Sequence, residues 1–153
     1  MRVYLVQHGK SKSKEEDPSR SLTQEGIGES TRIGEFLAQI GLSVSAIRHS
    51  GKTRAEQTAS LLGRGIGEGI GIEQSEGLAP LDDPQVMTES LNRICEDVML
   101  VGHLPHLERL ASTLLTGKPG HNPVQFKNSG VVCLERSEGK WWSLVWAITP
   151  ELL

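Results

Sequence analysis

The stretch Val3-Tyr4-Leu5-Val6-Gln7-His8-Gly9 is a short apolar run that ends abruptly on a histidine and a glycine. A run of β-forming residues of this length is typical of a buried strand, and Gly9 supplies the freedom for a turn after it. In open α/β sheets, ligands bind beyond the carboxyl ends of the central strands. The run therefore predicts a strand over residues 2–6 and places His8 at a ligand-binding edge.

The totals describe an ordinary globular chain. Its 153 residues suffice for one domain with a core of its own. The formal net charge of −3 gives no general attraction to nucleic acid or to acidic membranes, so we expect neither as a partner. We see no membrane-spanning run and no signal-peptide pattern. Cys95 and Cys133 are isolated in apolar surroundings, which predicts buried free thiols and a cytoplasmic protein.

Strand and helix patterns alternate along most of the chain. After a polar loop over residues 10–20, we expect a helix over 23–40, with Thr23 as its N-cap and Gly41 at its end. The later patterns predict, in order, a strand over 44–48, a helix over 52–62, a flexible glycine-rich turn over 63–71, a short strand near Ile72, a helix from Asp83 and Pro84, a strand over 98–101, a helix from Pro105, and strands over 131–134 and 141–148 joined across 137–140. This order predicts one α/β domain over residues 1–153, with a mainly parallel sheet and helices on both faces.

The spacing of apolar residues predicts which side chains are buried. Helical spacing gives two inner faces, one with Ile33, Phe36, Leu37 and Ile40 and the other with Met87, Leu91, Ile94 and Cys95. All three tryptophans fall in the final predicted strand, and no basic residues interleave with them. We therefore interpret them as packing residues rather than as a platform on which bases stack.

Four polar residues lie near the carboxyl ends of predicted strands. His8 follows the first strand, Arg54 follows the second, and His103 follows the strand over 98–101. Arg20 precedes the first helix and can reach the same edge. Because parallel strands end at one edge of a sheet, these side chains should converge at helix N-termini. Arginine forks fit phosphate oxygens, and helix ends add partial positive charge, so the sequence predicts a local anion site.

Two other interpretations of these segments are weaker. Ser50-Gly51-Lys52-Thr53 looks like the end of a nucleotide-binding P-loop, but that motif requires glycine at position 46, which is Ala46. His103 and His106 are three residues apart with Glu108 nearby. Pro105 intervenes and no further ligands cluster there, so we expect no metal site.

Three motifs occur in a fixed order: Gln7-His8-Gly9, Arg54-Ala55-Glu56-Gln57-Thr58-Ala59 and Val101-Gly102-His103-Leu104-Pro105. Together they resemble the histidine phosphatase superfamily, which is named for an Arg-His-Gly triplet at the first site. The short length and the Arg20-Ser21-Leu22-Thr23 segment are similar to its SixA-type branch of phosphohistidine phosphatases. The resemblance runs from residue 1 to about residue 135, and it implies a phosphoglycerate-mutase-like fold.

The resemblance also implies a two-step phosphoryl transfer without metal or cofactor. His8 would be the nucleophile and would become a phosphohistidine. Arg54 and His103 would stabilise the charge in transit, and Arg20, Gln7 and Gly9 would bind the phosphoryl group. A site of this kind needs positioning and positive charge more than elaborate bond chemistry.

Gln7 departs from the family pattern, which has arginine before the nucleophile. Glutamine can donate a hydrogen bond to a phosphate oxygen, but it brings neither charge nor a bidentate fork. By analogy with the loss of an oxyanion donor, the cost would be on the order of 10²- to 10³-fold in rate. Lys10 is close enough in sequence to supply a substitute charge, and we state this as a hypothesis.

The substrate is predicted from weak general-acid equipment. Glu76, Asp82 and Asp83 lie where larger members of the superfamily carry a proton donor, but none of them aligns clearly, and Asp83 fits a helix cap better. A phosphohistidine makes less demand on such an acid, because its P–N bond is labile.

We therefore expect a cytoplasmic, monomeric phosphatase. Its partner would be a phosphorylated protein, such as a histidine-containing phosphotransfer domain, or a small phosphorylated substrate. The alternatives are a broader small phosphomonoesterase and a catalytically weakened phosphate-binding or regulatory module. A mutase would need insertions that enclose the substrate, and the chain is too short for them.

Overall fold

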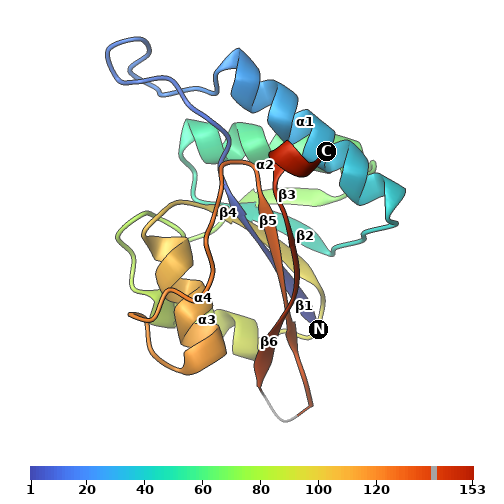
Figure 1. Ribbon diagram of the computed structural model, residues 1–153, viewed down its shortest axis with the longest axis vertical. Coiled ribbons are helices and arrows are strands. Elements are labelled where there is room, and N and C mark those ends of the chain that lie inside the picture. The colour runs from blue at the N-terminus through green and yellow to red at the C-terminus, as the bar shows by residue number, and fades with distance from the viewer. Residues whose placement is uncertain (139–140) are drawn as a thin grey trace.

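The computed structural model describes residues 1–138 and 141–153 (Figure 1). Its elements are β1 (Arg2–Gln7), α1 (Gln24–Gln39), β2 (Ala46–His49), α2 (Thr53–Ile66), β3 (Gly71–Gln74), α3 (Pro84–Arg93), β4 (Val98–Gly102), α4 (His106–Thr116), β5 (Val131–Arg136), β6 (Trp142–Ile148) and the 3₁₀ turn η1 (Pro150–Leu152). The predicted order of strands and helices is confirmed. Part of the turn predicted across 137–140 lies outside the described residues.

The described strands form one mixed six-stranded sheet in the order β3-β2-β4-β1-β5-β6. The first four strands of that order are parallel, whereas β5 runs antiparallel to β1, and β6 runs antiparallel to β5. The prediction of a mainly parallel α/β sheet is thus confirmed, with an antiparallel pair at one side. This topology puts the carboxyl ends of β1, β2 and β4 next to one another.

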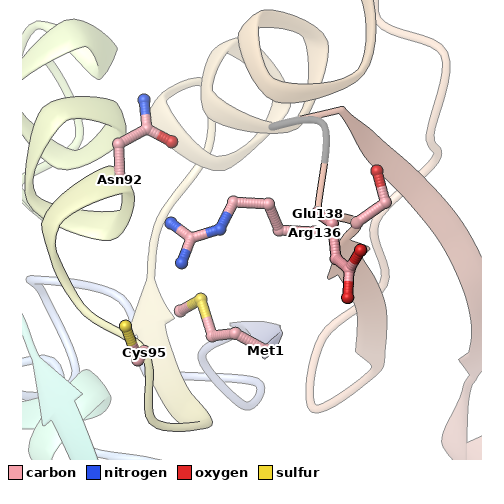
Figure 2. Close-up of a pocket in the computed structure, with 6 residues that line it drawn as sticks. Met1, Asn92, Cys95, Arg136 and Glu138 are labelled. Atoms are coloured by element: carbon pink, nitrogen blue, oxygen red, sulfur yellow. The ribbon is translucent and has the colours of Figure 1, made fainter.

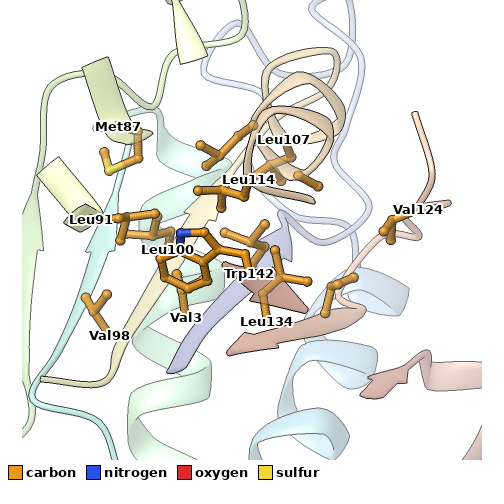
Figure 3. Packing of buried hydrophobic residues seen from close by; sticks show 14 of the residues in the cluster. Val3, Met87, Leu91, Val98, Leu100, Leu107, Leu114, Val124, Leu134 and Trp142 are labelled. Carbon is orange, nitrogen blue, oxygen red and sulfur yellow. The ribbon is translucent and has the colours of Figure 1, made fainter. Parts of the chain in front are cut away.

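Two pairs of helices cover the two faces of the sheet (Figure 1). Val3 and Leu5 of β1 pack in the cluster that includes residues of α3 and α4 (Figure 3). Tyr4 and Val6 point to the other face, in the cluster formed with α1 and α2. Burial on both faces explains why β1 is a continuous apolar run rather than an alternating one.

Helix caps follow the predicted chemistry. Thr23 accepts a hydrogen bond from the Gly26 N–H through its side chain at the start of α1. Asp83 does the same for the Gln85 N–H at the start of α3, with Pro84 at the first helical position. Both side chains satisfy donors that the first turn of a helix leaves unpaired.

The glycine-rich segment after Leu62 corrects one prediction. Helix α2 continues to Ile66, so the flexible turn expected over 63–71 begins only afterwards. A Cβ on Gly63 would lie 2.9 Å from Ile72 Cδ1, and one on Gly65 would lie 2.4 Å from the carbonyl carbon of Gly34. These glycines therefore permit close packing of α2 on β3 and α1, which composition alone does not distinguish from flexibility.

Three residues predicted to pack in the interior are exposed. Trp141 is 78% exposed because it precedes β6, so its prediction as a packing residue in that strand is wrong, whereas Trp142 is buried. Ile40 is 50% exposed because α1 ends at Gln39 and Ile40 forms its C-cap. Cys95 is exposed because α3 ends at Arg93, so Cys95 lies in the turn before β4. Cys133, on β5, is a buried free thiol as predicted. In the described residues no helix is both long and apolar enough to cross a membrane.

Cys95 lines a pocket of about 500 Å³ with Met1 and Arg136 (Figure 2). The Arg136 guanidinium donates to the carbonyls of Leu91 and Ile94, both at 2.8 Å. It thereby pairs carbonyls that the end of α3 leaves without helical partners. Met1 precedes β1, so this pocket lies at the amino end of that strand, opposite the predicted anion site.

Candidate active site

The carboxyl edge of the parallel strands brings three predicted site residues together. His8 follows β1, His103 follows β4, and Arg54 lies in the first turn of α2. The ring centroids of His8 and His103 are 5.0 Å apart, and Arg54 Nε lies 3.4 Å from His8 Nε2. Adjacent parallel strands produce this convergence, as the sequence predicted.

The His8 ring is held in one orientation. Its Nδ1 lies 2.7 Å from the Gly9 carbonyl oxygen. A carbonyl can only accept, so Nδ1 carries the proton. A neutral ring then keeps its lone pair on Nε2, the atom that faces Arg54. This is the tautomer that a nucleophilic Nε2 requires.

The backbone of His8 is held from two sides. Its N–H donates to the Gly102 carbonyl at 3.0 Å, and its carbonyl accepts from Asn128 Nδ2 at 2.8 Å. Asn128 precedes β5 and is 120 positions away in sequence. The backbone of His8 is therefore positioned by β4 and by the segment before β5, not by its own turn alone.

Both histidines of the site are neutral at pH 7. Burial, opposed by the Gly9 hydrogen bond and aided by the charges of Arg54 and Arg20, lowers the pKa of His8 to about 4. Burial, with the nearby His8 and Arg54, lowers the pKa of His103 to about 3. Burial also lowers the pKa of the Arg54 guanidinium, but an arginine remains charged at neutral pH. The site thus combines two neutral imidazoles with a charged guanidinium.

Gly9 occupies a position that admits no side chain. A Cβ there would lie 2.9 Å from Ser30 Oγ and 3.0 Å from Ser129 Oγ, and these two hydroxyls bond each other at 2.8 Å. The Gly9 N–H donates to Thr58 Oγ1 at 2.9 Å, and that hydroxyl donates to the Arg54 carbonyl at 2.7 Å. Thr58 thereby links the turn after His8 to the helix of Arg54.

Arg20 lies on the loop before α1 rather than in direct contact with the histidines. Its Nε and Nη2 are each 3.4 Å from loop acceptors, the Lys12 carbonyl and Ser11 Oγ. Its charge still contributes to lowering the pKa of His8 and of Arg54. Arg20 therefore adds positive potential at the edge of the site.

The side chains of Gln7 and Lys10 have different surroundings. The Gln7 side-chain oxygen is buried without a hydrogen-bond partner among the described residues. Lys10 Nζ lies 2.5 Å from Glu25 and 3.0 Å from Glu29. The ammonium is committed to these carboxylates, so the hypothesis that Lys10 replaces the family arginine is not supported.

The three candidate proton donors differ in their surroundings. Asp82 accepts from the Ala79 N–H at 2.9 Å, and Asp83 caps α3. Glu76 is exposed. All three line a pocket of about 410 Å³ that Ser50 also lines. Ser50 Oγ lies 2.6 Å from His103 Nε2, so this pocket adjoins the histidines.

No group of three or more metal-ligating side chains is found in the part of the chain that the structure describes. His106, which the sequence raised as a candidate ligand, is fully buried. Neither of its ring nitrogens has a hydrogen-bond partner among the described residues. Burial lowers its pKa, so the ring is neutral.

Sequence reasoning missed three residues that support the site: Ser50, Thr58 and Asn128. Thr58 lies within the quoted Arg54–Ala59 motif and follows Arg54 by four positions, so both share one helix face. That spacing could have indicated it. Ser50 and Asn128 carry no local signal, because their contacts depend on the sheet order.

Comparison with known proteins agrees with this geometry. Residues 3–82 match the histidine phosphatase superfamily (branch 1). An uncharacterized protein of Picosynechococcus is 30% identical over 141 residues, covering 88% of this chain and 84% of that protein. The phosphohistidine phosphatase SixA of Escherichia coli is 24% identical over 155 residues, covering 98% of this chain and 94% of SixA.

A solved structure has the same arrangement. The protein histidine phosphatase SixA complexed with tungstate superposes with a TM-score of 0.87 at 25% identity and 99% coverage of both chains. The fold is therefore the phosphoglycerate-mutase-like α/β fold expected from the resemblance. This chain belongs to the histidine phosphatase superfamily.

Proposed function

We propose that this protein removes the phosphoryl group from a protein phosphohistidine through a covalent intermediate on His8. The observation that carries the proposal is the pair of contacts on the His8 ring. Nδ1 is anchored on the Gly9 carbonyl at 2.7 Å, and Nε2 faces Arg54 Nε at 3.4 Å. A neutral lone pair beside a fixed cation suits attack on phosphorus.

The first step forms one bond and breaks one. His8 Nε2 attacks phosphorus, and the P–N bond of the substrate breaks opposite it. The electron pair of that bond goes to the substrate imidazole. The other nitrogen of that ring takes a proton from solvent water before the bond breaks, so imidazole leaves as a neutral ring. Arg54 and His103 face the phosphoryl oxygens, and Arg20 adds positive potential from its loop.

In the second step water attacks the phosphorus of phospho-His8. The P–Nε2 bond breaks, and its electron pair returns to the His8 nitrogen. Phosphate leaves with the oxygen that came from water. The anchored Nδ1–H keeps the ring in the same orientation, so His8 is ready for another cycle.

The choice of phosphohistidine rests on the carboxylates near the site. Asp82 and Asp83 are occupied in a turn and a helix cap, so they are poorly placed to protonate an ester oxygen. A phosphoramidate needs less acid assistance than an ester. SixA, the similar protein found both by sequence and among the solved structures, is named for activity on phosphohistidine or protein histidine, which supports the same substrate class.

Gln7 sets an upper limit on the rate. An amide in place of the family arginine removes a cationic fork, so we expect Gln7→Arg to raise kcat on the order of 10²- to 10³-fold, by analogy with a lost oxyanion donor. Arg54 remains charged, so the natural protein should still turn over.

The test measures phosphate release from a phosphohistidine-carrying phosphotransfer domain and from p-nitrophenyl phosphate, without added metal. Wild type should prefer the phosphohistidine, and His8→Ala should abolish turnover. A labelled phosphoenzyme should be trapped in wild type, labile to acid and stable to alkali. If wild type prefers the ester, the protein is a phosphomonoesterase rather than a phosphohistidine phosphatase. Inert wild type and inert Gln7→Arg on both substrates would contradict it altogether.

A further inference from the structure

Ser50 contacts the site without having a place in the phosphoryl transfer described above. It lies in the turn between β2 and α2, and its Oγ is 2.6 Å from His103 Nε2. The His103 ring thus has one nitrogen engaged by Ser50. Its other nitrogen, Nδ1, is buried and has no hydrogen-bond partner among the described residues.

The turn that carries Ser50 is held in place. The Gly51 N–H donates to His49 Nδ1 at 3.1 Å. Gly51 has φ +89°, and a Cβ there would lie 2.5 Å from the Gln74 side chain. The turn therefore depends on a left-handed glycine packed against the end of β3. Such a turn can hold a hydroxyl at a fixed distance from a neighbouring ring.

The Ser50 hydroxyl has a second hydrogen bond besides the one to His103, and it keeps a proton that can point at the ring. A hydroxyl has one proton and two lone pairs. The Lys52 N–H donates to Ser50 Oγ at 3.3 Å, which occupies one lone pair. The proton is then free to point at His103 Nε2. A neutral imidazole that accepts at Nε2 carries its own proton on Nδ1.

We propose that Ser50 is a positioning residue that holds His103 in the Nδ1-protonated tautomer, so that the ring presents a donor to the phosphoryl oxygens. Phosphoryl oxygens are acceptors, and the opposite tautomer would present them with a lone pair. A buried donor without a partner is costly in the free protein. A bound phosphoryl group would accept a hydrogen bond from this Nδ1–H. The effect of Ser50 on catalysis therefore rests on the proposed function, whereas the tautomer of His103 does not.

Nuclear magnetic resonance tests the tautomer directly. The ¹⁵N shifts of the two His103 ring nitrogens in the free protein distinguish a protonated Nδ1 from a protonated Nε2, with His103→Gln used to assign the signals. We expect Nδ1–H in wild type and a shift toward Nε2–H in Ser50→Ala. Ser50→Thr keeps a hydroxyl and should restore the wild-type pattern.

Ser75→Ala is the matched control. Ser75 lines the same pocket, but its hydroxyl donates to the Glu76 carbonyl at 3.1 Å rather than to a histidine. Removing it should leave the His103 tautomer unchanged. A Nε2–H tautomer in wild type, or an unchanged tautomer in Ser50→Ala, would overturn the proposal whatever the activity of the protein.

Binding and rate measurements then test whether the tautomer of His103 matters for catalysis. In metal sites, mutating a residue that orients a ligating histidine lowers affinity or activity about 10- to 100-fold. By analogy, we expect Ser50→Ala to lower kcat by a factor of that size and Ser50→Thr to restore it. Weaker binding of inorganic phosphate should accompany it. If no variant hydrolyses phosphohistidine, the proposed function fails, while the tautomer and phosphate binding still decide the role of Ser50.

Discussion

The parallel and antiparallel parts of the sheet contribute differently to the site. The parallel part supplies the side chains that would meet the phosphoryl group, because the ends of β1, β2 and β4 converge. The segment before antiparallel β5 supplies supports. Asn128 holds the His8 carbonyl, the Ser129 N–H donates to the Gln7 carbonyl at 2.9 Å, and Ser129 Oγ pairs with Ser30. The side chains proposed to contact the phosphoryl group and the residues that hold them in place thus come from separate parts of one sheet.

Removing Arg54 should produce the largest effect, because it deletes the cation that faces His8 Nε2, the proposed nucleophile. We expect Arg54→Ala to lower kcat/KM with the proposed substrate on the order of 10²- to 10³-fold. Arg64→Ala, at the exposed far end of the same helix, should leave it unchanged. Equal losses in both variants would mean that helix α2, rather than the Arg54 charge, limits the reaction.

Gly9 lies where the two parts meet, between Ser30 and Ser129. Gly9→Ala should lower the free energy of unfolding by about 1–3 kcal/mol, because the added methyl overpacks the hydroxyl pair. Gly28→Ala on α1 meets nothing within 4 Å, so it should instead raise stability by about 0.4–1 kcal/mol. Urea unfolding of both variants measures the difference. An unchanged free energy of unfolding in Gly9→Ala would show that the space between Ser30 and Ser129 is not tightly packed.

Acid should weaken the folded protein through its buried histidines. The folded pKa values of His8, His103 and His106 lie below the ordinary value of 6.5, so the unfolded chain binds protons first. The stability they contribute is present above pH 6.5 and is lost as the pH falls toward the folded values. Each contributes up to about 1.4 kcal/mol per pH unit.

His106 allows this to be tested away from the reacting atoms. We expect His106→Leu to lose less stability than wild type between pH 7 and pH 5, as measured by urea unfolding at each pH. His121→Leu changes an exposed histidine and should keep the wild-type slope. If the free energy of unfolding falls equally with pH in all three proteins, His106 does not contribute to the acid sensitivity.

Asn128 should show the smallest effect, because it acts only through the His8 backbone. Asn128→Ala leaves the His8 carbonyl without its side-chain donor, and we expect a loss of about 1 kcal/mol in the free energy of unfolding and a smaller loss of rate than Arg54→Ala. Lys127→Ala, at the exposed neighbouring position, is the control. A rate loss as large as that of Arg54→Ala would show that Asn128 is as important for the reaction as the residues that face the phosphoryl group.

Local patterns determined much of this protein from the sequence alone. The apolar run of β1, the caps Thr23 and Asp83, and the convergence of His8, Arg54 and His103 all follow from neighbouring residues and from parallel strand order. Such signals act over a few residues, so they survive without knowledge of the rest of the chain.

Contacts between distant segments were decided only by the tertiary structure. The bond from Asn128 to His8 spans 120 positions, and that from Ser50 to His103 spans 53. The pairing of Lys10 with Glu25 and Glu29 likewise depends on where α1 packs. Since each of these contacts exists only when two elements dock, no pattern within either segment could have predicted it.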